Sequence, residues 1–357
     1  MRFAPTDDQN DFVEAVSGLL ADTCTPDAVR SAWGGAVGRH TGLGDSDGRV
    51  RQAWDALTEM GVCGLMVPEA QGGLAMTDDD LVGIVIECGR AGLPDPIADT
   101  AGVAAAALGT LAGAGDETAA SWLERIAGGA TVVVGFGPSP LLSGAPTADA
   151  ILLLGHDPVT GTGEHTVDLF EAGSVELSSA DSVDGSRNLS QLHPGSRGAT
   201  RLAEGATAEA LVARAFDRAA VLDAALLVGL SARMLDITIE YVGERKQFGT
   251  AIGTFQAVKH HLADASLGIE FAEPLVRNAA HFMALGEDAA MVASMAKQRA
   301  SLAAVAASEA TLQCHGAIGY TVEADLHLFM KRAWALARSH GDADWHRARV
   351  RSALLAG

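Results

Sequence analysis

Apolar residues recur at helical spacing along about the first 128 residues of the chain. Acidic residues accompany the start of the first apolar run, as is common in the first turn of a helix. That run presents five apolar residues at helical spacing: Phe12, Val13, Val16, Leu19 and Leu20. Two strongly apolar segments, 78–89 and 100–112, predict further helices. Residues 1–128 are therefore expected to form an N-terminal helical domain.

The pattern changes between residues 129 and 205. Short apolar or β-branched runs, TVVVGF, AILLLG and HTVDLF, alternate here with clusters of Gly, Pro, Ser and Asp. Such runs, bounded by turn-forming residues, are typical of short antiparallel strands. A shortened middle β-domain is therefore expected over 129–205.

Helical periodicity returns from residue 206 to the end of the chain. The longest predicted helix runs from about Ala208 to Tyr241, and at 1.5 Å per residue it would be on the order of 50 Å long. One face of it is formed by Leu222, Leu226, Gly229, Leu230, Ile237 and Tyr241. A helix of this length suits a bundle that packs against partner subunits, so 206–357 is expected to be a C-terminal helical bundle domain. The predicted fold class is α+β, mostly α.

The composition, and above all the net charge, limits which kinds of molecule the protein is expected to bind. The 357 residues include few aromatics (5%) and give a formal net charge of −20. This charge argues against nucleic acid and against an anionic membrane surface as partners, because both need a basic face. A phosphate-rich ligand would have to be met by a few well-placed basic residues.

Cys24, Cys63, Cys88 and Cys314 stand apart in the sequence, beside apolar residues. Their spacing suggests neither a disulfide framework nor zinc ligands, so reduced cysteines and no metal are expected. The start of the chain lacks a basic segment followed by an apolar run, and no stretch approaches the length of a membrane span. A cytoplasmic location is expected.

Three segments are the most specific patterns in the chain. They are MVPEAQGGLAMTDDDLVGIVIECGRAGLPDP (66–96), YVGERKQFGTAIGTFQAVKHHLADA (241–265) and QCHGAIGYTVEADLHLFMKRA (313–333). In order and spacing they resemble segments of the acyl-CoA dehydrogenase family, and with the opening helices the resemblance covers nearly the whole chain. It implies an N-terminal helical domain, a small middle β-domain and a C-terminal four-helix bundle. It also implies FAD as cofactor and the α,β-desaturation of an acyl-CoA substrate.

Arg245 and Lys246 follow the long predicted helix, where a cation can reach an anionic ligand. The planar fork of an arginine suits a pyrophosphate, although the same residues would also suit a solvated helix end. The resemblance implies that Arg245 and Phe248 contact the ADP half of an FAD that belongs mainly to a neighbouring subunit. It assigns cofactor binding to six residues: Arg245, Phe248, Gln256, Gln313, Gly316 and Ala317. The family usually has glycine at the position of Ala317, but the contact there uses the backbone.

The usual catalytic base of the family is absent from its expected place. The reaction needs a carboxylate that removes the α-proton while the flavin accepts the β-hydrogen as hydride. The family's glutamate precedes a glycine, and the matching position in this chain is His340, before Gly341. His340 and Asp342 are therefore the candidates for a displaced base.

A minority of the family places the base on the long helix, at a position that matches Ala219 or Ala220. Asp217 and Asp223 are nearby in sequence, and both are expected to face other directions. The middle domain also lacks the family's Thr-Glu-Pro segment, since the corresponding stretch 135–150 is short and contains no tryptophan. This chain is accordingly not expected to hold its own flavin ring.

Three functional hypotheses follow from the retained and missing motifs. In the first, the chain is a subunit of an α2β2 acyl-CoA dehydrogenase, of the kind that acts on bulky acyl-CoAs such as those with steroid side chains. A paralogous partner would then supply the base and the flavin platform. In the second, the chain is a self-sufficient homo-oligomeric dehydrogenase that uses His340 or Asp342. The third is a flavin monooxygenase of the same fold, and a non-catalytic scaffold remains as a further alternative.

Overall fold

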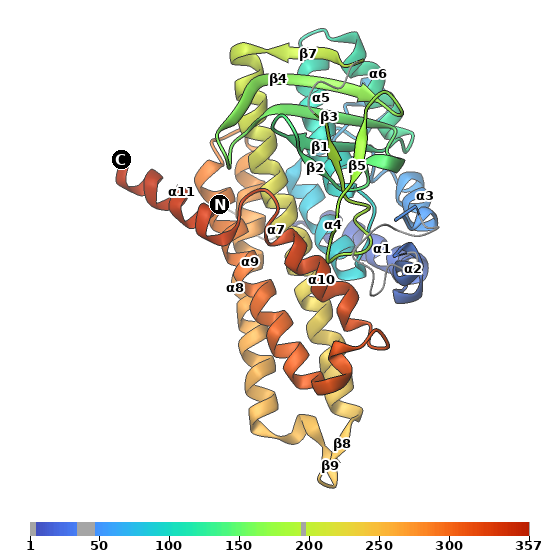
Figure 1. Ribbon diagram of the computed structural model, residues 1–357, viewed down its shortest axis with the longest axis vertical. Helices are drawn as coiled ribbons and strands as arrows, with labels where there is room; N and C mark the ends of the chain where they lie inside the picture. The colour runs from blue at the N-terminus through green and yellow to red at the C-terminus, as the bar shows by residue number, and fades with distance from the viewer. Residues whose placement is uncertain (1–4, 34–46, 194–197, 357) are drawn as a thin grey trace.

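The computed structural model describes residues 5–33, 47–193 and 198–356, and it begins with a helical region (Figure 1). This region comprises α1 (Asp7–Thr23), α2 (Pro26–Ala32), α3 (Arg51–Glu59), α4 (Asp78–Ala91), the π-helical turn η2 (Ala98–Ala104), α5 (Ala105–Gly113) and α6 (Glu117–Ala127). The Thr6 hydroxyl caps α1 by accepting the backbone N–H of Gln9. Most residues of α4 are buried, so this helix lies at the centre of the N-terminal part.

The middle of the chain forms two small sheets. The strands are β1 (Val132–Phe136), β2 (Leu141–Leu142), β3 (Ala150–Asp157), β4 (Thr162–Glu171), β5 (Leu177–Ser179), β6 (Ser190–Leu192) and β7 (Thr200–Glu204). One sheet has the order β1-β3-β4-β7 and the other the order β2-β6-β5. The expected antiparallel pairing holds for β3 with β4, but it is wrong for β1 and β3, which pair in parallel. The connection between these two strands contains β2 and crosses over instead of forming a hairpin.

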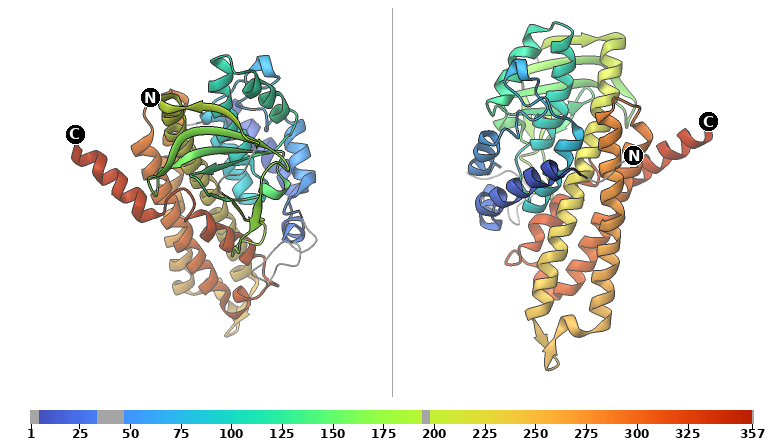
Figure 2. Two further views of the ribbon diagram at one scale, coloured as in Figure 1. Left: turned by 45° about the horizontal axis from the view of Figure 1, so that its top comes forward. Right: turned by 180° about the vertical axis from the view of Figure 1, so that it is seen from behind.

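The C-terminal part is a bundle of long helices (Figures 1 and 2). In chain order it consists of α7 (Gly205–Glu244), the hairpin β8 (Lys246–Gln247) and β9 (Thr250–Ala251), α8 (Gln256–Ala284), α9 (Ala290–His315), the turn η5 (Gly316–Tyr320), α10 (Leu326–Leu336) and α11 (Ala343–Ala356). The α11 helix projects away from the bundle. The mostly helical α+β fold class is thereby confirmed. Within the described ranges, no helix combines the length and apolar character needed to cross a membrane.

The N-terminal helices are joined to the bundle by a glycine seam between α4 and α7. A Cβ atom on Gly229 would lie 1.9 Å from the carbonyl oxygen of Ile86, and one on Gly89 would lie 2.4 Å from that of Leu226. No side chain fits at either position, so the two helices touch backbone to backbone. The seam fixes the middle of α7 against the N-terminal part.

Candidate functional site

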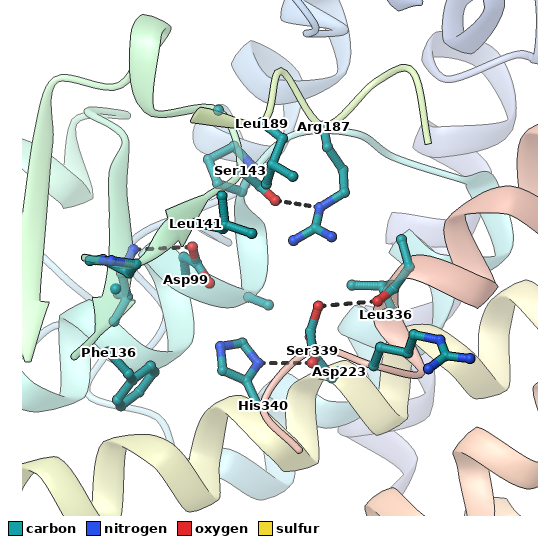
Figure 3. A pocket seen from close by; sticks show the side chains of 18 of the residues that line it. Asp99, Phe136, Leu141, Ser143, Arg187, Leu189, Asp223, Leu336, Ser339 and His340 are labelled. Carbon is teal, nitrogen blue, oxygen red and sulfur yellow. Dashed lines mark hydrogen bonds and ion pairs between the residues drawn. The ribbon is translucent and has the colours of Figure 1, made fainter. Parts of the chain in front are cut away.

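A cavity of about 980 Å³ lies between η2, the middle sheets, α7 and the turn after α10 (Figure 3). Phe136, Phe216 and Leu226 form apolar parts of its wall, and polar side chains enter it from several elements. Its volume is near the upper end of the range for small-molecule sites, and a few polar groups on apolar walls are typical of such sites. We therefore treat this cavity as the candidate site of chemistry.

His340 projects into the cavity from the turn after α10. Its backbone has φ 50° and that of Gly341 has φ 89°, a left-handed conformation that is uncommon for residues other than glycine. The turn places Nδ1 of His340 2.8 Å from Oδ2 of Asp223 on α7. Burial opposes ionisation of Asp223, but the charge and hydrogen bond of His340 and the charge of Lys297 outweigh burial and lower its pKa. Because a carboxylate only accepts hydrogen bonds, Nδ1 donates and Nε2 is left to act in the cavity (Figure 3).

Lys297 of α9 lies behind Asp223 and is fully buried. Its Nζ donates to the carbonyl oxygen of Leu336 at 2.8 Å and to that of Gly341 at 3.4 Å, and lies 3.9 Å from Oδ2 of Asp223. Burial lowers the pKa of Lys297 to about 8, against the opposing charge of Asp223. Lys297, Asp223 and His340 thus form a buried row that leads from the core to the cavity. The lysine also anchors the turn that bears the histidine.

Asp99 lines the cavity from η2, and its carboxylate accepts the backbone N–H of Val134 at 3.1 Å. Burial raises the pKa of Asp99 to about 6, although His340 and the Val134 N–H act in the opposite direction. This carboxyl group is therefore able to exchange a proton near neutral pH. It lies on a π-helical turn, which is rare in proteins and is frequently found at functional sites.

Arg187 enters the cavity facing the side on which His340 lies (Figure 3). Its Nε donates to Oγ of Ser143 at 2.6 Å. Burial lowers the pKa of Arg187, and the nearby Asp184 acts to raise it. Asp184 itself lies 3.6 Å from the buried Arg332. The cavity thus holds an arginine whose direct partner is a neutral hydroxyl.

The six residues expected to bind the cofactor lie at the other end of the bundle, and none of them lines the cavity (Figure 1). They are Arg245 at the end of α7, Phe248 in the turn of the β8–β9 hairpin, Gln256 at the start of α8, Gln313 in the last turn of α9, and Gly316 and Ala317 in η5. Tyr241 stacks on His315 with 4.4 Å between ring centroids, which joins the ends of α7 and α9. We call this region the open end of the bundle.

Comparison with known proteins identifies the family of the chain. Two family models match the chain, the acyl-CoA dehydrogenase N-terminal domain over residues 6–130 and the acyl-CoA dehydrogenase C-terminal domain over residues 209–355. The acyl-CoA dehydrogenase IpdE2 of Mycobacterium tuberculosis is 31% identical over 340 residues, which cover 95% of this chain and 93% of that protein. The chain belongs to the acyl-CoA dehydrogenase family.

Solved structures share the fold at low sequence identity. The Tcur3481-Tcur3483 steroid ACAD matches with a TM-score of 0.83 at 21% identity, and the match covers 98% of each chain. The ChsE4-ChsE5 complex from Mycobacterium tuberculosis matches with a TM-score of 0.80 at 21% identity over the full length of both chains. A structure described as PigA with FAD and proline matches with a TM-score of 0.79, also at 21% identity and over both full lengths. These matches confirm the acyl-CoA dehydrogenase fold expected from the sequence.

In this member of the acyl-CoA dehydrogenase family, the open end presents groups that suit the ADP half of an FAD. Phe248 is 93% exposed, and Arg245 is exposed and forms no ion pair with any residue that the structure describes. The backbone of Gly316 has φ 65° and ψ −140°, and the space where a side chain would stand is open, so a ligand can approach it closely. An exposed aromatic ring beside an exposed guanidinium suits a nucleotide diphosphate presented by another molecule.

The cavity fits the ring half of an FAD less well. The segment 135–150 stands where the sequence lacks the family's Thr-Glu-Pro motif, and two of its hydroxyl groups are engaged within the chain. Ser139 donates to the carbonyl oxygen of Leu192 at 2.8 Å, and Ser143 accepts the hydrogen bond from Arg187. We therefore derive no chemical step that depends on a flavin ring held by this chain.

The prediction that Asp223 faces away from the family's alternative base position is wrong. Asp223 follows Ala219 by four residues, which is one turn along the same face of a helix. Ala219 and Ala220 are themselves buried. Asp217 pairs with Arg349 of α11 and does not line the cavity, as expected from its position.

The two candidate bases differ in what they contact. Asp342 lies at the rim of the cavity, and its Oδ1 accepts the backbone N–H groups of Asp344 at 3.1 Å and Trp345 at 2.9 Å. The carboxylate of Asp342 therefore caps the start of α11. His340 has a free ring nitrogen and a buried carboxylate partner, so it is the better placed of the two.

Three polar groups of the cavity and its support were not found from the sequence: Asp99, Arg187 and Lys297. Lys297 did leave a signal, because it lies four residues after Ala293 and three before Ala300, on the buried alanine face of α9. A lysine on such a face is buried and needs a partner. Asp99 and Arg187 have no comparable local pattern, since only the fold brings them to one cavity.

Proposed function

We propose that this chain is a subunit of an FAD-dependent acyl-CoA dehydrogenase and that its open end contacts the ADP half of an FAD held mainly by a neighbouring subunit. The observation that supports this most directly is the exposure of Phe248, 93%, at the tip of a hairpin. Asp223 in the cavity and Arg245 at the open end are separated by about 33 Å along α7, at 1.5 Å per residue. A ring of this size exposed at the end of a long bundle is best explained by contact with a second molecule.

The partner is proposed to be a paralogous subunit in an α2β2 assembly. The engaged hydroxyl groups of Ser139 and Ser143 support this, because a chain that does not hold a flavin ring needs another chain to hold it. Two of the structural neighbours are described by pairs of component names, ChsE4-ChsE5 and Tcur3481-Tcur3483. Our proposal extends that two-component arrangement to this chain.

The residues of this chain would then bind and orient rather than react. The Arg245 guanidinium would neutralise the diphosphate with paired hydrogen bonds, and Phe248 would cover the nucleotide from solvent. The backbone at Gly316 offers a close approach to the adenosine part. When bound, FAD supplies the acceptor for the β-hydrogen of the acyl group.

Flavin content and native mass test this proposal. The chain purified alone is expected to contain much less than one FAD per chain by absorbance, and co-expression with a paralogous subunit is expected to give an α2β2 mass by light scattering. Stoichiometric FAD in the isolated chain would contradict the two-component arrangement. A homotetramer with one FAD per chain would instead show that the open end serves a second copy of this chain.

A second candidate function is favoured by the 2.8 Å contact between His340 and Asp223. In this alternative the cavity is the chain's own site, and Nε2 of His340 removes the α-proton of the acyl thioester. Asp223 would hold the ring by Nδ1 and stabilise the imidazolium that forms. His340→Gln would then lower turnover of the assembled enzyme by roughly 10²–10⁴-fold. Turnover that survives this substitution would show that His340 is not the base.

A further inference from the structure

Arg187 is a cation in the cavity without a carboxylate partner. No carboxylate oxygen lies within ion-pair distance of its guanidinium among the residues that the structure describes, and its side chain donates a hydrogen bond to the neutral Oγ of Ser143 at 2.6 Å. The other guanidinium nitrogens point into the cavity (Figure 3). Arginine has five N–H donors in a planar fork, so most of its hydrogen-bonding capacity is available to a ligand.

The carboxylates near Arg187 are each engaged by another group. Asp223 accepts from His340, Asp99 accepts the backbone N–H of Val134, and Asp184 accepts from Ser186. Burial lowers the pKa of Arg187, and the charges of Asp184 and Asp223 act at longer range to raise it. Removing a cation from water without a direct anionic partner is costly, and a ligand anion would offset that cost.

We propose that Arg187 binds a second carboxylate on the acyl chain, so that the preferred substrates are acyl-CoAs that carry an acid group away from the thioester. This inference rests on the second of the two proposed functions, since it requires an acyl-CoA to enter the cavity of this chain. Arg187 and His340 face each other across the cavity, so one ligand can place its thioester end towards the histidine and its acid end towards the arginine (Figure 3). The fork of Arg187 matches a carboxylate with two parallel hydrogen bonds.

A structural role for Arg187 is the competing explanation. In that case the hydrogen bond to Ser143 would tie the segment after β2 to the loop before β6, and the ligand would contact other groups. This role uses one donor of the fork and leaves the remaining donors in a cavity with no anion. The ligand role uses the remaining donors as well, which is why we favour it.

Binding measured by calorimetry tests the inference without any need for turnover. The full-length chain would be titrated with succinyl-, glutaryl- and adipyl-CoA and with the matched butyryl-, pentanoyl- and hexanoyl-CoA. At least one carboxylated probe is expected to bind about tenfold or more tightly than its matched probe, because a charge-assisted hydrogen bond is among the stronger polar contacts. The chain has a formal net charge of −20, so nonspecific attraction cannot produce such a preference.

Variants separate the two roles of Arg187. Arg187→Gln is expected to abolish the preference and leave binding of the uncharged probes within about twofold, while Arg187→Lys, which keeps the charge but loses the fork, is expected to retain part of it. Ser143→Ala should keep the preference. Arg214→Gln, at an exposed arginine of α7 outside the cavity, is the matched control and should change neither series. Thermal melts would show that each variant is folded.

Each outcome decides a different point. If the wild type binds both series equally, or Arg187→Lys and Arg187→Gln keep the full preference, the inference is wrong while binding of acyl-CoA by this chain stands. If the wild type binds no probe of either series, the cavity does not receive an acyl-CoA in this chain, and both the inference and that part of the proposed function fail.

Discussion

The open end and the cavity are built in opposite ways, although α7 belongs to both. At the open end, Arg245 and Phe248 are exposed, and no ion pair in the described part of the chain involves Arg245. In and behind the cavity, the buried or half-buried charged groups of one row contact one another, from Lys297 through Asp223 to His340. The open end is an exposed surface, to which our proposal assigns contact with another molecule. The cavity is a set of coupled charges whose properties depend on their neighbours within the chain.

This difference determines how each region responds to change. A substitution at the open end is expected to remove a contact with the proposed ligand and to leave the fold as it was, because the side chain is solvated. A substitution in the buried row leaves an unpaired group in the interior, which is costly. The predictions below test this contrast, starting with the largest expected effect.

Glycine-to-alanine substitutions should lower the free energy of unfolding more in the seam beside the cavity than at the open end. Gly229→Ala places a Cβ atom 1.9 Å from a carbonyl oxygen in the seam with α4, so we expect it to lower the free energy of unfolding by about 3 kcal/mol or more. Gly249→Ala in the hairpin at the open end has free space but a φ of 83°, so about 1 kcal/mol is expected. Denaturant titration of both variants measures the difference. Equal losses would mean that the seam is not rigid.

The buried lysine should make the free energy of unfolding depend on pH in the alkaline range. The pKa of Lys297 is lowered from 10.5 to about 8 by burial, so between these values the unfolded chain binds more protons than the folded chain. Stability of the wild type should therefore rise with pH from about 8 to 10.5 relative to Lys297→Met, by roughly 3 kcal/mol in total. The comparison with the variant is essential, because buried Cys24 and Cys63, whose pKa values are raised to about 12 and 11, act in the opposite direction above pH 9. Parallel stability curves for wild type and variant would contradict this prediction.

Loss of the open-end contacts should affect the flavin and leave the fold intact. In the assembled enzyme, Arg245→Ala combined with Phe248→Ala is expected to weaken FAD binding roughly 100-fold, from the lost charge-assisted hydrogen bonds and ring contact. The unfolding free energy should change by less than about 0.5 kcal/mol, because both side chains are exposed. Lys259→Ala, at another exposed cation on α8, is the control and should leave flavin affinity unchanged. Unaltered FAD content in the double variant would refute the proposed contact.

The smallest effect is a shift in the titration of one carboxyl group. Asp99 should titrate at a pH of about 6, since burial raises its pKa. His340→Ala should raise that pKa further, because the charge of His340 favours the ionised form. Arg245→Ala, at the open end, should not move it. Carboxyl carbon shifts in NMR would follow the titration, and a response to the Arg245 change would show that the two regions are electrostatically coupled.

The fold could be predicted from the sequence because its signals are local, and the segment that our proposal places at the open end is local as well. The apolar period of the long helix predicted α7 to within a few residues at each end, and the Arg245–Phe248 segment lies in one continuous motif. The pairing direction of β1 and β3 could not be predicted in the same way, since it depends on how the intervening segment crosses the sheet.

The cavity was harder to predict because its groups come from distant parts of the chain. Asp99, Arg187, Asp223 and His340 belong to four different segments, and only the packed fold makes them neighbours. The position of His340 was predicted by its place before Gly341, where the family has its base. Its partner Asp223 was missed, although spacing along the helix from Ala219 would have placed it on that face.

The glycine seam attaches α7 rigidly to α4. The helix is held at Gly229, between the cavity and the open end, with no side chain to cushion the contact. A rigid helix that is held at this point fixes the distance from Asp223 to Arg245. That distance stays constant when loops on either side of the helix move. A neighbouring subunit that binds the open end, as we propose, would therefore lie at a fixed distance along α7 from the cavity. In such an assembly the register between the two protein chains would be determined by the number of residues in one helix.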